Sequence, residues 1–495
     1  MFPMGTSKFQ PFPKNVIYNI YAKCDEAGYN DISKNPFIYG DKKVRNENFV
    51  NCTFNIISPK EVYSSDGTIH VIGYGSRLYK KISFGFKFNK NFLGRKAIKV
   101  RAMAGDPSLV REKVSSELFK AVGVPTQEGT YARLFINNDI YGLYSIIDSL
   151  SSKWIKSYVH GNEKAKIGFS YQLVSSPPEG PYCDLKYKGD NYEAYNSYTL
   201  DEYDEKDIKT NDTQEKWNSL ISFTKMYDQW VKTYSSDTTN KGVEELKKFL
   251  NIESTLRLMA IETLLLALDN FFLVSSNSAI YYNPERKNYQ FIPFDFDQTM
   301  NGSRKNRMIP ENYMSDCITW VNKDDGVYYD HYFTNNLLKH PKIKERYDVI
   351  LAIITRSAFV PDTISSYVNA VESLIDEDVQ WSFSCIDNLN IHSAGYVNKY
   401  TYEEHKSNLE YGTIEYEENV KDEDIVFGVR GWVEKRGDGC RAYTANVDTS
   451  KNENISDDVE VELFKSSFDF SILSFNSTKL SLFLIILHFI FYLFF

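Results

Sequence analysis

Three aspartates stand among apolar residues near the middle of the chain, and their spacing is suited to chemistry. Asp269 follows the leucine-rich run at residues 253–268, and Asp295 and Asp297 follow the apolar stretch NYQFIP. Charged groups beside buried segments cost free energy unless a cation or hydrogen bonds compensate them. Residues i and i+2 of an extended chain point to the same side, so Asp295 and Asp297 can share one cation.

Asn277 follows Asp269 by eight residues, and this order of groups suits phosphoryl transfer. In that chemistry one aspartate orients the attacking hydroxyl, while an asparagine and a later aspartate bind the metal ions that bridge the phosphates. Solvated acids in surface loops are the alternative interpretation for each aspartate taken alone. Paired carboxylates also suit glycoside hydrolysis, which depends on a separation that the fold sets.

Motifs of other enzyme classes are absent from the sequence. The chain has no G-x-x-x-x-G-K-[ST] loop and no G-x-S-x-G elbow, and its seven histidines form no H-E-x-x-H or H-x-H pair. A zinc hydrolase is therefore not expected. The net charge of -9 argues against nucleic acid as a partner. The 36 tyrosines and six tryptophans also suit a glycan-binding protein, although Tyr-rich strands more often belong to a core.

Composition indicates a folded, exported protein. The 495 residues, 42% of them hydrophobic and 25% charged, allow two or three domains or one large domain. Six cysteines without a C-x-x-C pair exclude a zinc ribbon and permit three disulfides in an oxidising compartment. Five N-x-S/T sequons agree with secretion, at Asn51, Asn211, Asn301, Asn454 and Asn476.

The two ends of the sequence differ in character. Residues 1–15 contain no apolar segment of the signal-peptide type, whereas residues 480–495 are almost entirely apolar. The apolar run is short for a membrane span, so we expect a GPI-attachment signal, with a hydrophobic membrane anchor as the alternative. Residues 476–478 are the expected attachment site, and 466–467 the alternative. Because such an anchor requires export, we expect the natural N-terminus to lie upstream of this sequence.

Apolar patterns predict the elements that position the acids. Alternation predicts strands over 67–101 and a hairpin over 131–148. Asp106 as N-cap and Pro107 in the first turn predict a helix over 106–122. An acidic, exposed segment is expected at 402–424, and further helices at 214–234, 243–250, 253–268, 335–357 and 361–378.

Several motifs, taken in order, resemble the CotH family of spore-coat-protein-H-like atypical kinases. GYGSRLYKKISFGFKF resembles a family block with Lys81 at its lysine position, although Ile72 replaces the usual arginine. DPSLVREKVSSELFKAVGVP resembles the family's D-P-x-x-x-R-E-K-L helix, and RLFINNDIYGLYSIID its hairpin, with Asp148 where bacterial members tend to carry Glu. STLRLMAIETLLLALDN, NSAIYYNP and FIPFDFDQTM resemble its catalytic block. The similarity runs from about Gly67 to Tyr443.

The resemblance implies an α+β, atypical protein-kinase-like fold with a β-rich N-lobe and a helical C-lobe. It implies transfer of the ATP γ-phosphate, with Mg²⁺ or Mn²⁺, to Ser, Thr or Tyr of a spore-coat or cell-wall protein. By position, Lys81 binds the nucleotide phosphates and Asp269 is the catalytic aspartate. Glu112 and Glu117 are both candidate acidic partners of Lys81. The implied metal ligands are Asn277, Asp295 and Asp297.

Certain fungal members of the family are invasins that bind a host surface receptor through the segment between the catalytic aspartate and the later acids. Here that segment, residues 273–289, lacks the invasin pattern rich in Gly, Asp and Thr, so receptor binding is not carried over. We expect a secreted, GPI-anchored kinase of a cell or spore surface. The alternative is a kinase-fold adhesin or spore-wall protein without catalysis. The expected organisation is a β-rich N-terminal extension at 1–65, a kinase-like domain at 66–445, a disordered stalk at 446–479 and the apolar tail at 480–495.

Overall fold

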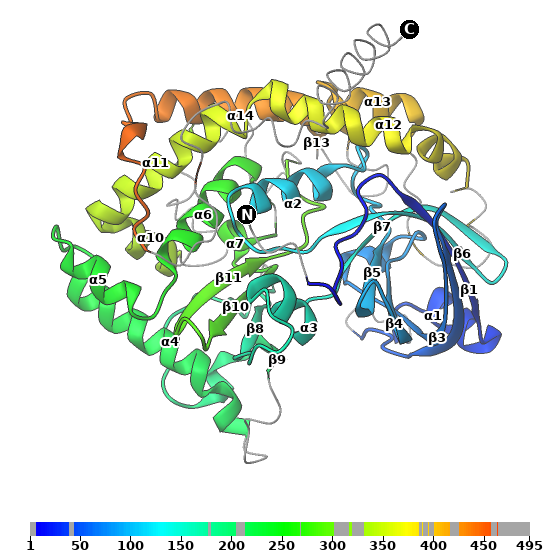
Figure 1. Ribbon diagram of the computed structural model, residues 1–495, viewed down its shortest axis with the longest axis horizontal. Coiled ribbons are helices and arrows are strands. Elements are labelled where there is room, and N and C mark those ends of the chain that lie inside the picture. The colour runs from blue at the N-terminus through cyan, green and yellow to red at the C-terminus, as the bar shows by residue number, and fades with distance from the viewer. Residues whose placement is uncertain are drawn as a thin grey trace, which may run out of the picture.

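The computed structural model joins a β-barrel to a helical part that covers a small sheet (Figure 1). It describes residues 6–38, 44–176, 180–203, 213–267, 269–300, 316–318, 331–385, 400–415 and 425–456, and the single residues 389, 395 and 463. The α+β class expected from the sequence is therefore confirmed. The expected tail at 480–495 and both expected anchor sites lie outside the described residues.

The barrel has the closed strand order β1-β2-β3-β4-β5-β7-β6. β1 pairs in parallel with β6, and this pairing closes a sheet that is otherwise antiparallel. Strands before and after residue 65, the expected domain boundary, therefore share one barrel. Its strands are β1 (Ile17–Cys24), β2 (Val50–Ile57), β3 (Val62–Val71), β4 (Phe84–Phe92), β5 (Arg95–Arg101), β6 (Gly129–Ile136) and β7 (Asp139–Asp148).

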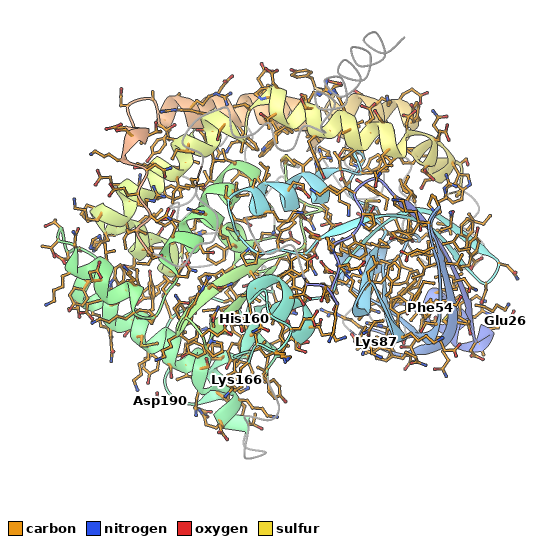
Figure 2. All side chains as sticks on the ribbon, in the orientation of Figure 1. Glu26, Phe54, Lys87, His160, Lys166 and Asp190 are labelled. Atoms are coloured by element: carbon orange, nitrogen blue, oxygen red, sulfur yellow. A yellow bond between two sulfur atoms is a disulfide. The ribbon has the colours of Figure 1, made fainter. Side chains whose placement is uncertain are left out.

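Alternation along the strands fills the barrel with apolar side chains. On β2, Cys52, Phe54 and Ile56 are buried, whereas the residues between them are exposed. Phe54 contacts the rings of Phe86 and Phe88 inside the barrel (Figure 2). The barrel is therefore a packed core.

The second part of the fold is a helical layer over a four-stranded sheet of order β11-β10-β8-β9. Its strands are β8 (Ser170–Leu173), β9 (Tyr198–Glu202), β10 (Ser278–Asn283) and β11 (Asn288–Pro293). The remaining elements are α1 (Glu26–Lys34), α2 (Arg111–Ala121), α3 (Ser152–Trp154), α4 (Thr213–Tyr234), α5 (Lys241–Lys247), α6 (Ile252–Leu265), α7 (Phe271–Val274), α10 (Tyr332–Lys339), α11 (Pro341–Ser357), α12 (Pro361–Cys385), α13 (Tyr402–Leu409), α14 (Val429–Tyr443) and the pair β12 (Ile414–Glu415) and β13 (Ile425–Val426).

Helix α6 lies at the centre of the helical part, because every one of its residues is buried. Asn251 caps its N-terminus by accepting a hydrogen bond from the Ser254 amide, and Leu266 ends it in the left-handed conformation. The chain then turns directly into the segment that carries Asp269. A fully buried helix thus fixes where that aspartate lies.

Helix α2 begins five residues later than the sequence predicts. Asp106 accepts hydrogen bonds from the amides of Ser108 and Arg111 and pairs with the Arg111 guanidinium. These contacts order residues 106–110 as a turn that leads into the helix. The helix expected at 335–357 is likewise divided into α10 and α11, because Pro341 begins the second helix after an extended His340.

Helix α12 joins the two parts of the fold and runs along the top of both in Figure 1. Arg133 of β6 pairs with Asp378, and the Leu143 amide of β7 donates to the Ser382 hydroxyl at 3.0 Å. Within the described ranges no single helix is long and apolar enough to cross a membrane. Only α11 and α12 taken together, bent by 59° at their junction, meet that criterion.

Two disulfides and an ordered C-terminal segment complete the described structure. Cys24 pairs with Cys52 and Cys317 with Cys440, whereas Cys183 and Cys385 are free and buried. Two of the three disulfides permitted by the cysteine count are therefore formed. Residues 446–456, expected to belong to a disordered stalk, instead pack on the helical part, where Asn454 accepts from Arg257 of α6 and Arg346 of α11.

Candidate active site

The three predicted aspartates and Asn277 meet beside the end of β11. Asp269 lies between α6 and α7, and its backbone carbonyl accepts a hydrogen bond from the Asn277 side chain at 3.2 Å. The Asn277 carbonyl in turn accepts from the Phe294 amide at 3.0 Å, next to Asp295. The sequence prediction that these residues share one site is thus consistent with the fold.

Positive φ angles occur at two of these positions. Asn277 has a φ of 48° and Asp295 a φ of 64°. Asn and Asp are the non-glycine residues that enter the left-handed region most readily, because their short polar side chains can hydrogen-bond locally. Strained backbone of this kind collects at functional sites, where surrounding contacts hold it in place.

Arg101, at the end of β5, binds the acids that follow β11. Its Nη2 atom contacts Asp295 Oδ1 and lies 2.8 Å from Asp297 Oδ2, and its Nε atom lies 3.1 Å from Glu112 Oε1 of α2. One cation from the barrel therefore binds both helix α2 and the acidic segment after β11, two elements that pack in the core of the helical part. Asp295 and Asp297 face the same side, as their spacing predicts.

Lys99 is a second cation of β5 at this site. It lies two residues before Arg101 on the same side of the strand, with its ammonium 5.4 Å from the centre of the Phe294 ring. Burial lowers the pKa of Lys99, while the charge of Asp295 opposes that shift. No carboxylate lies within 4 Å of its ammonium in the part of the chain that the structure describes, so this charge is available to an anionic ligand.

The pKa values of Asp295 and Asp297 shift in opposite directions, although both carboxylates contact the Arg101 guanidinium. Burial disfavours ionisation of Asp295, but the Arg101 charge outweighs it and lowers the pKa of that carboxyl. Burial raises the pKa of Asp297 well above its usual range, and the charges of Asp295, Asp269 and Glu112 add to the rise. Negative charge is thus in excess around Asp297, an arrangement that favours a further cation.

Asp269 is held by neighbours on two sides. Its carboxylate accepts a hydrogen bond from Gln298 Nε2 at 3.2 Å. Behind it lies Glu262 of α6, where burial and the Asp269 charge raise the pKa to about 8. Glu262 is therefore mostly protonated at neutral pH.

Helix α2 contacts the acidic segment through two side chains, and a third binds Arg101. Glu112 binds Arg101, the Ser115 and Thr299 hydroxyls lie 2.9 Å apart, and Phe119 stacks on Phe296 with ring centres 5.0 Å apart. Phe296 stands between the two acids and points away from them. The position of α2 is thereby coupled to that of Asp295 and Asp297.

Lys81 contacts β7 and α12, and not the acids after β11, among the described residues. Its ammonium donates to the Leu143 carbonyl at 2.7 Å and lies 4.8 Å from the centre of the Tyr144 ring. Burial lowers its pKa to about 7. Its candidate partners pair with other cations, Glu112 with Arg101 and Glu117 with Lys14 and Lys120. The role predicted for Lys81 in ATP binding stays a prediction.

A divalent metal suits the donor set of the site. Among the described residues no three His, Cys, Asp or Glu side chains are arranged as a metal site. Arg101 lies where the oxygens of Asp295 and Asp297 converge, and these carboxylates are 31% and 29% exposed, so solvent reaches them. Carboxylate and amide oxygens are the ligands that Mg²⁺ and Mn²⁺ prefer. Asn277, Asp295 and Asp297 therefore fit the metal by chemistry.

The residues that sequence reasoning missed are Lys99 and Arg101, and it considered Glu112 only as a partner of Lys81. A signal was present, because AIKVRAM alternates apolar and basic residues directly before the D-P motif. Alternation places both cations on one side of a strand. Asp295, one of the partners of Arg101, lies 194 positions further along the chain.

Comparison with known proteins shows which family the sequence matches. The profile of the family described as CotH kinase protein matches residues 69–412. Invasin CotH2 of Rhizopus delemar is 25% identical over 413 residues, which cover 82% of this chain and 64% of the relative. Spore coat protein homolog 1 of the same organism is 23% identical over 371 residues, covering 74% of this chain and 54% of the relative. The chain thus spans less than two thirds of the length of these relatives.

A solved structure, that of the Helicobacter pylori proinflammatory kinase CtkA, matches with 12% identity and a TM-score of 0.22, covering 61% of this chain and 94% of CtkA.

Proposed function

Because the chain belongs to the CotH kinase protein family, we propose that it is an atypical protein kinase. It transfers the ATP γ-phosphate to a Ser, Thr or Tyr hydroxyl of a coat or wall protein. The observation that carries the proposal is the convergence of Asp295, Asp297 and Glu112 on Arg101 of β5, with the charge of Asp269 close enough to act on Asp297. A structural role alone does not call for so many partly buried charges in one place, since each costs free energy to desolvate.

Each residue of the site has a proposed task. Asp269 accepts a hydrogen bond from the substrate hydroxyl and orients its oxygen toward the phosphate. Asn277, Asp295 and Asp297 hold Mg²⁺ or Mn²⁺, which neutralises phosphate charge when bound. Arg101 keeps the two carboxylates aligned, and Glu112 holds Arg101 in place.

The cation that binds the phosphates is either Lys99 or Lys81. The motif resemblance favours Lys81. Lys99 is the alternative, because it lies beside Asp295 without an ion pair among the described residues. Lys81 instead donates to a backbone carbonyl. Replacing each lysine by methionine separates the two assignments.

A surface location fits the disulfides and the names of the relatives. Disulfides form in oxidising compartments, and two are present here. Relatives are named as invasins and as a spore coat protein homolog. We propose that this chain is likewise secreted, with the apolar segment at 480–495 as its GPI signal or membrane anchor.

One observation favours a second candidate, a surface adhesin on a kinase scaffold without catalysis. Arg101 already lies between the oxygens of Asp295 and Asp297, as expected of a site that has ceased to bind metal. On this alternative the acids serve only to hold the two parts of the fold together.

Thermal unfolding of the full chain with ATP and Mn²⁺ separates the two candidates. A ligand at a hundred times its Kd stabilises the folded state by about 2.7 kcal/mol. We expect wild type and Asp269→Asn to be stabilised and Asp295→Asn not to be. Of Lys99→Met and Lys81→Met, the one that loses the effect identifies the phosphate-binding cation. Lys23→Met, an exposed change on β1, is the control.

Transfer of radiolabelled γ-phosphate to a mixture of coat or wall proteins then tests catalysis. Asp269→Asn should bind nucleotide but transfer phosphate at least about a hundredfold more slowly, as is usual when a proton-accepting group is lost. If wild type is folded and ATP with Mn²⁺ leaves its unfolding temperature unchanged, the kinase proposal is wrong and the adhesin takes its place.

A further inference from the structure

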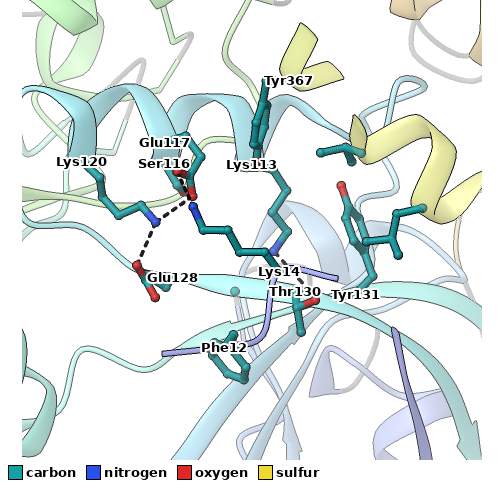
Figure 3. Close-up of a pocket in the computed structure, with 13 residues that line it drawn as sticks. Phe12, Lys14, Lys113, Ser116, Glu117, Lys120, Glu128, Thr130, Tyr131 and Tyr367 are labelled. Atoms are coloured by element: carbon teal, nitrogen blue, oxygen red, sulfur yellow. Dashed lines mark hydrogen bonds and ion pairs between the residues drawn. The ribbon is translucent and has the colours of Figure 1, made fainter. Parts of the chain in front are cut away.

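A pocket lies on the side of α2 that faces away from the acids, between this helix, β6, α12 and the segment before β1 (Figure 3). We call it the α2 pocket. Its volume of about 40 Å³ holds roughly three water molecules, which is room for one phosphate group. Its polar lining consists of Lys14, Lys113, Ser116, Glu117, Lys120, Glu128, Thr130 and Tyr367.

Lys113 is the buried charge of this pocket. The residue is 6% exposed, and its ammonium donates to the Thr130 carbonyl at 3.3 Å and lies 5.1 Å from the Tyr131 ring centre. Within the described ranges no carboxylate lies within 4 Å of it. An ammonium has three donors, so Lys113 retains two that no described protein group satisfies. A buried cation left in this state is costly unless a ligand pairs with it.

Two further lysines stand at the same pocket and are held by acids. Lys14 lies 2.9 Å from Glu117, and Lys120 lies 2.7 Å from Glu117 and 2.8 Å from Glu128, as the dashed lines of Figure 3 mark. Three cations thus face two carboxylates, and the excess positive charge is that of Lys113. Burial lowers the pKa of Lys113 only to about 8, so it is charged at neutral pH.

The rest of the lining suits an oxyanion held out of bulk water. Phe12, Val371 and Leu374 supply apolar contacts on one side. The Tyr367 hydroxyl makes no hydrogen bond to other described residues, and is a further donor at the same place. Apolar surroundings strengthen an ion pair by excluding water.

We propose that the α2 pocket is a phosphate-binding site, with Lys113 as the paired cation and Lys14 and Tyr367 as additional donors. The phosphate is either a free anion or the phosphate group of a phosphorylated side chain. Both present the same oxygens to Lys113, and Arg or Lys pairs with such groups are among the stronger hydrogen bonds in proteins.

Phosphate binding at this pocket also bears on the candidate active site. Lys113 directly follows Glu112, the residue that holds Arg101 against the acids. Ser115 and Phe119 of the same helix contact the segment around Phe296. A ligand in the α2 pocket that restricts the motion of α2 therefore restricts the position of Glu112 as well. This consequence rests on the proposed kinase function, whereas binding itself does not.

Calorimetric titration of the full chain with inorganic phosphate, without nucleotide or metal, tests the site. A second titration uses a short phosphoserine peptide, and its unphosphorylated form is the control. Wild type should bind one or both phosphate probes. Lys113→Met should weaken binding by about tenfold or more, and Lys14→Gln and Tyr367→Phe by smaller factors, whereas Lys23→Gln should have no effect.

The outcomes separate the possibilities. Binding of inorganic phosphate identifies a free anion as sufficient, and binding of the phosphopeptide alone identifies a phosphorylated protein segment as the ligand. If neither probe binds wild type, or if Lys14→Gln and Lys113→Met bind as tightly as wild type, the proposal is overturned. Because the titration contains no ATP or metal, its result is independent of whether the chain is a kinase.

Discussion

Replacing Arg101 by glutamine should reveal how strongly the acids repel one another. Arg101 is 11% exposed and is the shared partner of Glu112, Asp295 and Asp297. Removing one partner of a fully buried ion pair costs about 3–5 kcal/mol, because the other charge stays buried. Since Asp295 and Asp297 are 31% and 29% exposed, water screens part of this cost, and we expect about 2–4 kcal/mol.

The free energy of unfolding, measured in urea at pH 7, provides the assay. Arg133→Gln is the matched control, because it removes another Arg–Asp pair of the barrel whose arginine is 40% exposed. Solvent reaches this arginine although Asp378 is 5% exposed, so the loss should be smaller than for Arg101, about 1–2 kcal/mol. Mn²⁺ should restore more stability to Arg101→Gln than it adds to wild type, since a metal ion supplies the positive charge that the variant lacks.

Lowering the pH should reduce the loss of unfolding free energy that Arg101→Gln causes. Without the guanidinium, the carboxyls of Asp295 and Asp297 have raised pKa values in the folded state. A carboxyl of this kind destabilises the fold as pH rises through its folded-state pKa, so the cost is present at pH 7 and is relieved below. If Arg101→Gln is no less stable than Arg133→Gln at pH 7, or if its loss is the same in acid, the electrostatic interpretation is wrong.

Two further predictions concern other parts of the fold. Burial lowers the pKa of Lys81 to about 7, so the unfolded chain binds more protons than the folded one above that pH, and stability should rise from pH 7 to pH 9. Wild type should gain about 2 kcal/mol over Lys81→Met in that interval, and equal pH profiles in urea unfolding would show that Lys81 is solvated. The Cys317–Cys440 disulfide closes a longer sequence separation than Cys24–Cys52, 123 against 28. Cys440→Ser should therefore lower stability by about 1 kcal/mol more than Cys52→Ser, and the reverse order would contradict the loop-entropy argument.

Local sequence patterns were sufficient to predict where the acidic residues lie, but not to predict that Arg101 is their partner. Asp269, Asn277 and Asp295 lie at the ends of strongly apolar segments, and such ends are readily located from periodicity. Arg101 binds Asp295 across a separation of 194 residues, and nothing in the local pattern of a strand specifies which distant charge it meets.

The differences at element ends have similar causes. Asp106 followed by Pro107 is a typical helix start, but Asp106 binds Arg111 and the turn replaces the first helical residues. Residues 446–456 are polar enough to suggest disorder, yet Asn454 is held by two arginines of the helical core. In the first case an arginine within the predicted helix decides the structure, and in the second case two arginines distant in the sequence do.

The parallel pairing of β1 with β6 has a consequence for folding during synthesis on the ribosome. Ile17 pairs with Tyr131, so one edge of β1 has no partner until roughly 110 further residues have been made. At ~5–20 residues per second, roughly 5–20 s of synthesis separates the two strands. An unpaired strand edge is a template for wrong association. The Cys24–Cys52 disulfide can form early in this interval, because both cysteines belong to the first hairpin-like pair, and it would hold the register of β1 until its second neighbour arrives.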